Sequence, residues 1–156
     1  MTPDQLARLF SRYGDDVYRF AYSYTRHAAD AEDICQSVFC RLAAGRIQLE
    51  EGREKAWLLT CAANACKNRF RFLRRWPSAP LEEALDIPSE PDRAVLEAVL
   101  ALPMKYRAPV HLYYYEGYSQ GEIADILSLS RTAVQTRMQR ARAMLKEALS
   151  EDDDTL

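Results

Sequence analysis

Residues 131–142 carry side chains that could recognise the bases of DNA. On a helix of 3.6 residues per turn, short polar side chains and an arginine share one face, and further arginines lie on its flanks. Such side chains can contact base edges in a major groove and hold backbone phosphates. The face consists of Thr132, Gln135, Thr136, Gln139 and Arg140, and the flanks carry Arg131, Arg137 and Arg142.

Two short helices and a tight turn are predicted to position this face. Ser119 and Glu122 have the spacing of a capping box, so a first helix begins there, and Ser130 caps a second helix. An apolar stripe of Val134, Met138, Ala141 and Leu145 must be buried. The turn needs Ser128 in a left-handed conformation, at a cost of about 1 kcal/mol. The pattern is typical of a helix-turn-helix, although an ordinary helical hairpin would share it.

A second basic segment lies in the first half of the chain. A helix over 55–75 is expected to bury Trp57, Leu58, Cys61, Ala62 and Ala65. Its second half interleaves phenylalanines with cations, and this composition suits contact with phosphates and unstacked bases. Five cations are more than the negative end of a helix alone would explain. They are Lys67, Arg69, Arg71, Arg74 and Arg75, with Phe70 and Phe72 between them.

An acidic helix is predicted over 30–42, with Asp30 as its N-cap. Ile34, Val38, Phe39 and Leu42 are expected to face inward. The outward face is then largely acidic and is either simply solvated or a protein-binding surface. It comprises Asp30, Glu32, Asp33, Gln36, Ser37 and Arg41.

The cysteines and histidines do not form a catalytic or metal-binding pattern. Cys35 and Cys40, like Cys61 and Cys66, are five residues apart, which points the members of each pair about 140° apart on a helix. Small buried or half-buried thiols are therefore expected. His27 is expected at a helix C-terminus, and His111 is expected to be packed; no catalytic residue, metal or cofactor is predicted.

The chain is predicted to be all-α, with two helical domains. Residues 1–75 carry 13 Lys and Arg against 9 Asp and Glu, and 92–150 carry 8 against 6. The linker 76–91 has four acids and four prolines, and the tail 151–156 has four acids.

The first domain is expected to hold four helices, the first ended by Gly14, and an exposed loop over 43–54. Pro109 should delay or bend a helix over 106–116. No signal peptide or membrane span is evident, so a cytoplasmic protein is expected.

In combination, several stretches resemble the extracytoplasmic-function (ECF) sigma factors of bacterial RNA polymerase. They occur in the family's order: DAEDICQSVFCRL at 30–42, WLLTCAAN at 57–64, LP at 102–103, EGYS at 116–119, EIA at 122–124, TAVQTR at 132–137 and RAR at 140–142. Four positions depart from the family pattern: Ala63 stands for Arg, Asn68 for Asp, Gln135 for Lys, and Pro109 for Val or Ile. Ala63 and Asn68 weaken the polar pairing that the family has within its minus-ten helix. Gln135 should alter the preference for bases of the upstream promoter element.

The resemblance implies a sigma region 2 domain and a sigma region 4 helix-turn-helix domain, which bind core RNA polymerase and promoter DNA. It implies polymerase contacts at Asp30, Glu32, Asp33, Gln36 and Phe39. It implies minus-ten contacts by the 43–54 loop and by Asn64, Lys67, Asn68, Arg71, Arg74 and Arg75. It implies minus-thirty-five contacts by Arg131, Thr132, Gln135, Thr136, Arg137 and Arg140. An anti-sigma factor as a further partner and a monomeric free protein are also implied.

Two other functions compete with this hypothesis. A homodimeric repressor could use the second domain alone, but it would leave the acidic and basic helices of the first domain without a role. An enzyme could be built on Cys61 or Cys66 with His27 or His111, but no phosphate loop, triad or metal spacing accompanies these residues.

Overall fold

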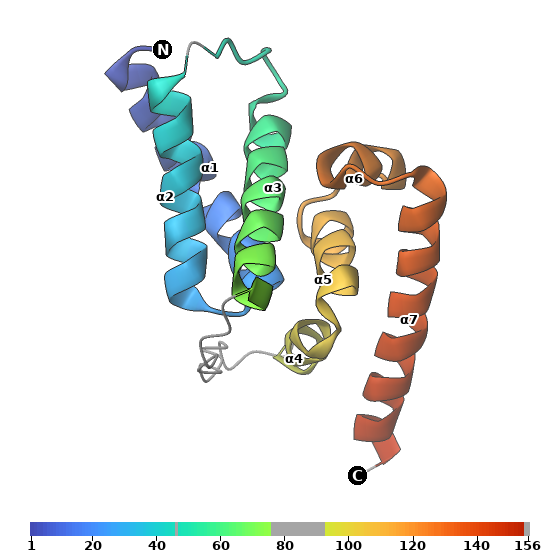
Figure 1. Ribbon diagram of the computed structural model, residues 1–156. Coiled ribbons are helices and arrows are strands. Elements are labelled where there is room, and N and C mark those ends of the chain that lie inside the picture. The colour runs from blue at the N-terminus through green and yellow to red at the C-terminus, as the bar shows by residue number, and fades with distance from the viewer. Residues whose placement is uncertain (46, 76–92, 155–156) are drawn as a thin grey trace. The chain divides into compact units, whose positions relative to one another are not determined.

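The computed structural model describes residues 1–45, 47–75 and 93–154, with side chains for 1–45, 47–71 and 94–150. Every regular element in these ranges is a helix, which confirms the all-α prediction (Figure 1). The chain divides into two compact units, Met1–Glu83 and Ala84–Leu156. The predicted linker 76–91 lies outside the described residues. None of the helices in the described ranges combines the length and apolar character needed to cross a membrane.

The first unit begins with one long helix, α1 (Pro3–Thr25), and the predicted break at Gly14 is wrong. Gly14 is buried inside the helix, and a Cβ atom there would lie 3.5 Å from the ring of Phe10. The Sγ of Cys35 donates to the Gly14 carbonyl at 3.6 Å. Gly14 therefore does not end a helix, and the described part of the unit has three helices instead of four.

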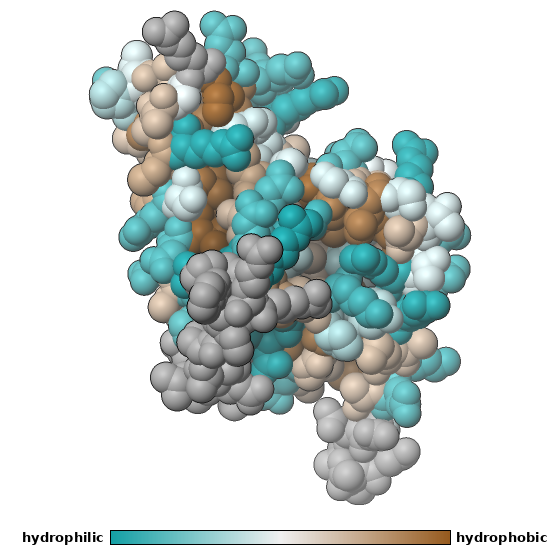
Figure 2. All heavy atoms as spheres, viewed as in Figure 1, coloured by the Kyte–Doolittle hydropathy of each residue, from teal (hydrophilic) through white to brown (hydrophobic). Residues whose placement is uncertain are grey.

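The other two helices are α2 (Ala28–Ala44) and α3 (Glu54–Arg75), and each packs against α1 and against the other. Their shared core is apolar and almost fully excluded from water. Figure 2 shows apolar side chains in the seam between α2 and α3 and hydrophilic ones on the outer side of α2. Trp57 and Cys61 are only half-buried, and Leu59, Ala63 and Cys66 join the core instead. The core includes Val17, Phe20, Ala21, Ile34, Val38, Leu42, Leu58, Leu59 and Ala62.

The second unit contains α4 (Arg93–Ala101), α5 (Met104–Val110), the π-helical turn η1 (His111–Tyr115), α6 (Gln120–Leu127) and α7 (Arg131–Asp154). The α7 stripe is confirmed, because Val134, Met138 and Ala141 are fully buried, and Leu145 is half-buried. In α4, Val99 is buried and Val95 is exposed.

Pro109 lies inside α5, which begins at Met104 and therefore earlier than predicted. Proline has no N–H to donate to the carbonyl of Lys105, four residues earlier. That carbonyl instead accepts from Nη1 of Arg137 on α7, at 3.5 Å. Beyond Val110 the chain widens into η1, where the Glu116 N–H donates to the His111 carbonyl at 3.2 Å. The disturbance expected at Pro109 thus appears just after it, where the α-helix changes to a π-helical turn.

Candidate DNA-binding and protein-binding surfaces

The helix-turn-helix is built from the local interactions that its sequence predicts. The Ser119 N–H donates to Glu122 Oε1 at 3.1 Å, and the Glu122 N–H donates to Ser119 Oγ at 3.2 Å. These hydrogen bonds, the backbone one first, hold the pKa of Glu122 below its ordinary value. Ser128 adopts the left-handed conformation, with φ 56°, and Ser130 Oγ accepts from the Ala133 N–H at 3.0 Å. The capping box, the turn and the second cap are all confirmed.

The polar face of α7 lies opposite the buried stripe. Thr132, Gln135 and Gln139 are exposed there, and Thr136 is half-buried. Arg131 is exposed and lies over Gly121 of α6, where a Cβ atom would come within 3.1 Å of its guanidinium. A helix with this face can present several short polar groups to a groove, and Gly121 leaves the space that Arg131 occupies.

The other α7 arginines contact neighbouring helices. Arg137 is half-buried and bonds the Lys105 carbonyl, and Arg140 is exposed and helps to lower the pKa of Tyr106 against the effect of burial. Arg142 donates from Nε to the Tyr114 hydroxyl at 3.4 Å and lies over the ring of Tyr113. The hydrogen bond to Tyr114 raises the pKa of Arg142. These contacts fix the positions of the guanidinium groups along α7.

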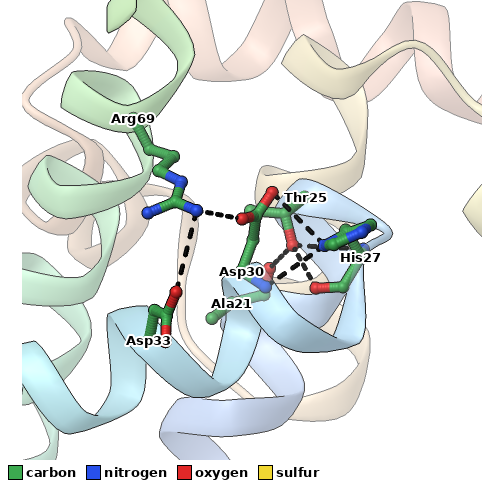
Figure 3. Close-up of polar contacts among 6 residues, drawn as sticks. All are labelled: Ala21, Thr25, His27, Asp30, Asp33 and Arg69. Atoms are coloured by element: carbon green, nitrogen blue, oxygen red, sulfur yellow. Dashed lines mark hydrogen bonds and ion pairs between the residues drawn. The ribbon is translucent and has the colours of Figure 1, made fainter. Parts of the chain in front are cut away.

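The acidic helix α2 begins earlier than predicted, because His27 and not Asp30 is its N-cap. Nδ1 of His27 accepts from the Asp30 N–H at 3.2 Å. Thr25 Oγ1 donates to the Ala21 carbonyl at 2.8 Å and accepts from the His27 N–H at 3.4 Å, which orders the turn between α1 and α2 (Figure 3). His27 therefore has a structural role, as expected, but at the start of a helix.

Asp30 is held by Arg69 of α3, as Figure 3 shows. The Asp30 side chain is only 15% exposed, and Nη2 of Arg69 bonds its Oδ1. The same nitrogen lies 3.7 Å from Oδ2 of Asp33, whose side chain is 60% exposed. The predicted outward acidic face is therefore divided: Asp30 serves the α2–α3 contact, while Asp33 stays open to solvent with Glu32 and Gln36.

Phe39 is a correction to the predicted polymerase contacts. Its side chain is 6% exposed and packs edge-on against the ring of Phe10, at a centroid distance of 5.1 Å. This agrees with the inward orientation that helical periodicity predicts and removes Phe39 from the accessible surface. Phe10 itself is 54% exposed and borders the same helix.

The basic face of α3 retains most of its predicted members. Asn64, Asn68 and Arg71 are exposed, and Lys67 and Phe70 are half-buried. Arg74 and Arg75 belong to the last turn of α3, but their side chains lie outside the described residues. Arg69 is committed to the acids of α2, so the cations of this helix do not form one uniform surface.

The thiols and His111 are packed rather than assembled into a site. Burial raises the pKa of Cys66 to about 12, and burial also raises the pKa of Cys35 and Cys61. Cys40 is exposed, contrary to the expectation for all four. His111 is buried, with Nε2 at 3.4 Å from Oε1 of Glu116. Across the described ranges, no three His, Cys, Asp or Glu side chains are arranged to hold a metal ion.

Comparisons with known proteins agree with this arrangement. The Sigma-70 region 2 family model matches residues 9–76, and the Sigma-70 region 4 model matches 92–145. The ECF RNA polymerase sigma factor SigM of Mycobacterium tuberculosis (strain Erdman) is 30% identical over 91% of this chain and 76% of its own length. A probable RNA polymerase sigma factor, RfaY of Xanthomonas campestris, is 31% identical over 95% of this chain, which spans only 41% of that longer protein.

A solved structure shares the fold. The sigma factor RpoE of Bartonella quintana, crystallised with the anti-sigma factor NepR, superposes with a TM-score of 0.70 at 20% identity, covering 94% of this chain and 97% of that one. Matches to both units leave no support for a repressor that uses the second unit alone. The chain belongs to the ECF family of RNA polymerase sigma factors, the proteins that direct promoter-specific initiation of transcription.

Proposed function

We propose that this chain docks on core RNA polymerase through the exposed acids of α2 and recognises two promoter elements through α3 and α7. The observation that carries the proposal is that exposed acids lie on one helix of the first unit and exposed amides with an arginine lie on another. Glu32, Asp33 and Gln36 are exposed on α2, while Asn64, Asn68 and Arg71 are exposed on α3. One folded unit can thus meet a basic protein surface and DNA with different helices.

In this proposal the 43–54 segment and the α3 residues Asn64, Lys67, Asn68, Arg71, Arg74 and Arg75 bind minus-ten bases in the opened strand. The face of α7 binds the minus-thirty-five duplex through Arg131, Thr132, Gln135, Thr136 and Arg140, and those of them that contact base edges discriminate by about 1–3 kcal/mol for each good contact. Residues 1–75 and 92–150 are the two domains, joined by 76–91. Each domain alone binds weakly, and polymerase raises the effective concentration of the second site.

In this proposal the protein acts by binding and not by catalysis. It works in the cytoplasm, where RNA polymerase is found, and is a monomer when free. An anti-sigma factor that covers the exposed α2 acids would block the same polymerase contact. The sigma factor structure solved with its anti-sigma factor supports this type of regulation.

In vitro transcription with purified core polymerase and a promoter library tests the proposal. Charge reversal by Asp33→Lys should abolish promoter-directed transcripts, because Asp33 is exposed on α2 and would then repel a basic docking surface. Asp4→Lys is the matched control, since Asp4 is an exposed acid of α1 in the same unit. Circular dichroism should show folded protein for both variants. Full activity of Asp33→Lys would contradict the docking assignment.

A further inference from the structure

Helices α5 and α7 of the second unit meet where three cations and one tyrosine lie. Lys105 and Tyr106 come from α5, and Arg137 and Arg140 come from α7. Arg137 Nη1 donates to the Lys105 carbonyl at 3.5 Å, and Lys105 Nζ lies 5.1 Å from the centre of the Tyr106 ring. Arg140 also acts on Tyr106, because it helps to lower the pKa of that phenol against the effect of burial. Lys105 and Arg140 are exposed, so this phosphate cluster, as we name Lys105, Tyr106, Arg137 and Arg140, opens to solvent.

The phosphate cluster has no internal counter-charge. No ion pair among the described residues involves Lys105, Arg137 or Arg140. Although burial raises the pKa of Tyr106, hydrogen bonds to Arg140 and Lys105 outweigh it and lower the pKa. A low phenol pKa reports a positive local potential. Converging cations repel one another, and an anion bound between them would relieve that repulsion.

The position of the cluster on α7 indicates which anion this is. Counting 100° per residue from buried Val134, Arg137 and Arg140 lie about 60° and 120° to one side, beside α5. Arg131 and Arg142 lie about 60° and 80° to the other side, beside α6 and η1. The short polar side chains lie between these two flanks. A helix about 10–12 Å wide fills a major groove about 12 Å wide, so its two flanks face the two phosphate strands.

We propose that the phosphate cluster binds a backbone phosphate of one strand of the minus-thirty-five duplex, with Lys105 as a DNA contact outside the helix-turn-helix. This rests on the proposed function of α7. Arg137 is turned towards α5 by its bond to the Lys105 carbonyl, so it holds phosphate instead of reading a base. Arg131 and Arg142 stand where the opposite strand passes. The cluster therefore sets affinity and register, while Thr132 and Gln135 set sequence preference.

The test is promoter binding by the full chain assembled with core polymerase, measured over a series of salt concentrations on the preferred promoter and on one with altered minus-thirty-five bases. Lys105→Gln should weaken binding to both promoters by the same factor, about three- to tenfold, and reduce the slope of log K against log salt by about 1. Lys105→Arg should restore affinity and slope. Lys146→Gln removes an exposed lysine of α7 away from the cluster and should change neither.

The outcomes separate the two proposals. An unchanged salt slope for Lys105→Gln, or a change in base preference with constant slope, would overturn the phosphate cluster while leaving promoter recognition intact. If the wild-type assembly shows no preference between the two promoters, the proposed function fails, and the phosphate cluster fails with it. Thermal melting of each variant checks that exposed Lys105 does not act through folding.

Discussion

The two units use arginines in opposite ways on the helices that we propose to bind DNA. In the first unit, Arg69 of α3 forms ion pairs with Asp30 and Asp33 of α2. In the second unit, Arg137 of α7 donates to a carbonyl oxygen, and Arg140 helps to lower the pKa of the Tyr106 phenol against the effect of burial. Both helices carry arginines, but α2 presents carboxylates to Arg69, whereas α5, which Arg137 contacts, contains no acidic residue.

Whether an arginine is paired with a carboxylate decides how much of its positive charge remains available to bind a ligand. Arg69 neutralises a carboxylate that is 15% exposed, and an isolated charge at that depth would be costly. Its charge is therefore used within the fold. Contacts with neutral oxygens position Arg137 and Arg140 without cancelling their charge. Counting basic residues along a helix consequently overstates the DNA-binding charge of α3 more than that of α7.

The largest expected effect comes from breaking the apolar stripe that seats α7. Met138→Ala should destabilise the second unit by about 3 kcal/mol, because Met138 is fully buried and the substitution leaves a cavity. Amide hydrogen exchange read separately for the two units is the measurement. Met144→Ala, at an exposed methionine of the same helix, should have little effect. An equal loss of protection in both units would show that they do not unfold independently, and the comparison between them would fail.

A smaller loss is expected when the ion pair of the first unit is removed. Arg69→Gln leaves the mostly buried Asp30 carboxylate without its cation, which should cost about 2 kcal/mol in the first unit. Arg71→Gln is the matched control, because Arg71 is exposed on the same helix and should affect DNA binding instead of stability.

Replacing both partners of this pair tests the cause. Arg69→Gln with Asp30→Asn should recover most of the lost free energy of unfolding, because no charge remains buried. Thermal melting and hydrogen exchange of the first unit measure this. The Arg69 assignment would be wrong if Arg69→Gln melted like wild type, or if the double variant were no more stable than Arg69→Gln.

The helix-turn-helix could be predicted from sequence because its determinants are local. The capping box at Ser119, the turn at Ser128 and the cap at Ser130 each depend on hydrogen bonds to residues at most four positions away. The stripe of α7 follows from helical periodicity alone. Exposure of the polar face then follows from burial of the opposite one, so the candidate reading residues were placed correctly on the surface.

The errors lie where a distant residue decides the outcome. Gly14 was predicted to end a helix, but α1 continues through it and packs against α2, where the thiol of Cys35 donates to the Gly14 carbonyl. Asp30 was predicted to be a surface cap, but Arg69, 39 residues later, holds it. The contact between Arg137 and the Lys105 carbonyl was not predicted either. That carbonyl is available because Pro109 has no N–H to donate to it. Composition and spacing carry no signal for such pairings, because they depend on how helices cross.

The smallest expected effect, a response to salt, tests the comparison most directly. Salt screens attraction and repulsion alike, so the two units should respond with opposite sign. Raising KCl from about 0.05 to about 0.5 M should cost the first unit a few tenths of a kcal/mol and give the second about as much. The loss arises at the ion pairs of the first unit, which include Asp33–Arg69 and Lys55–Asp16, each at 3.7 Å. The gain arises from reduced repulsion within the phosphate cluster.

Hydrogen exchange at both salt concentrations measures both units in one sample. Arg69→Gln should reduce the loss in the first unit, and Lys105→Gln should reduce the gain in the second. A shift of the same sign in both units would mean that arginine pairing does not distinguish them.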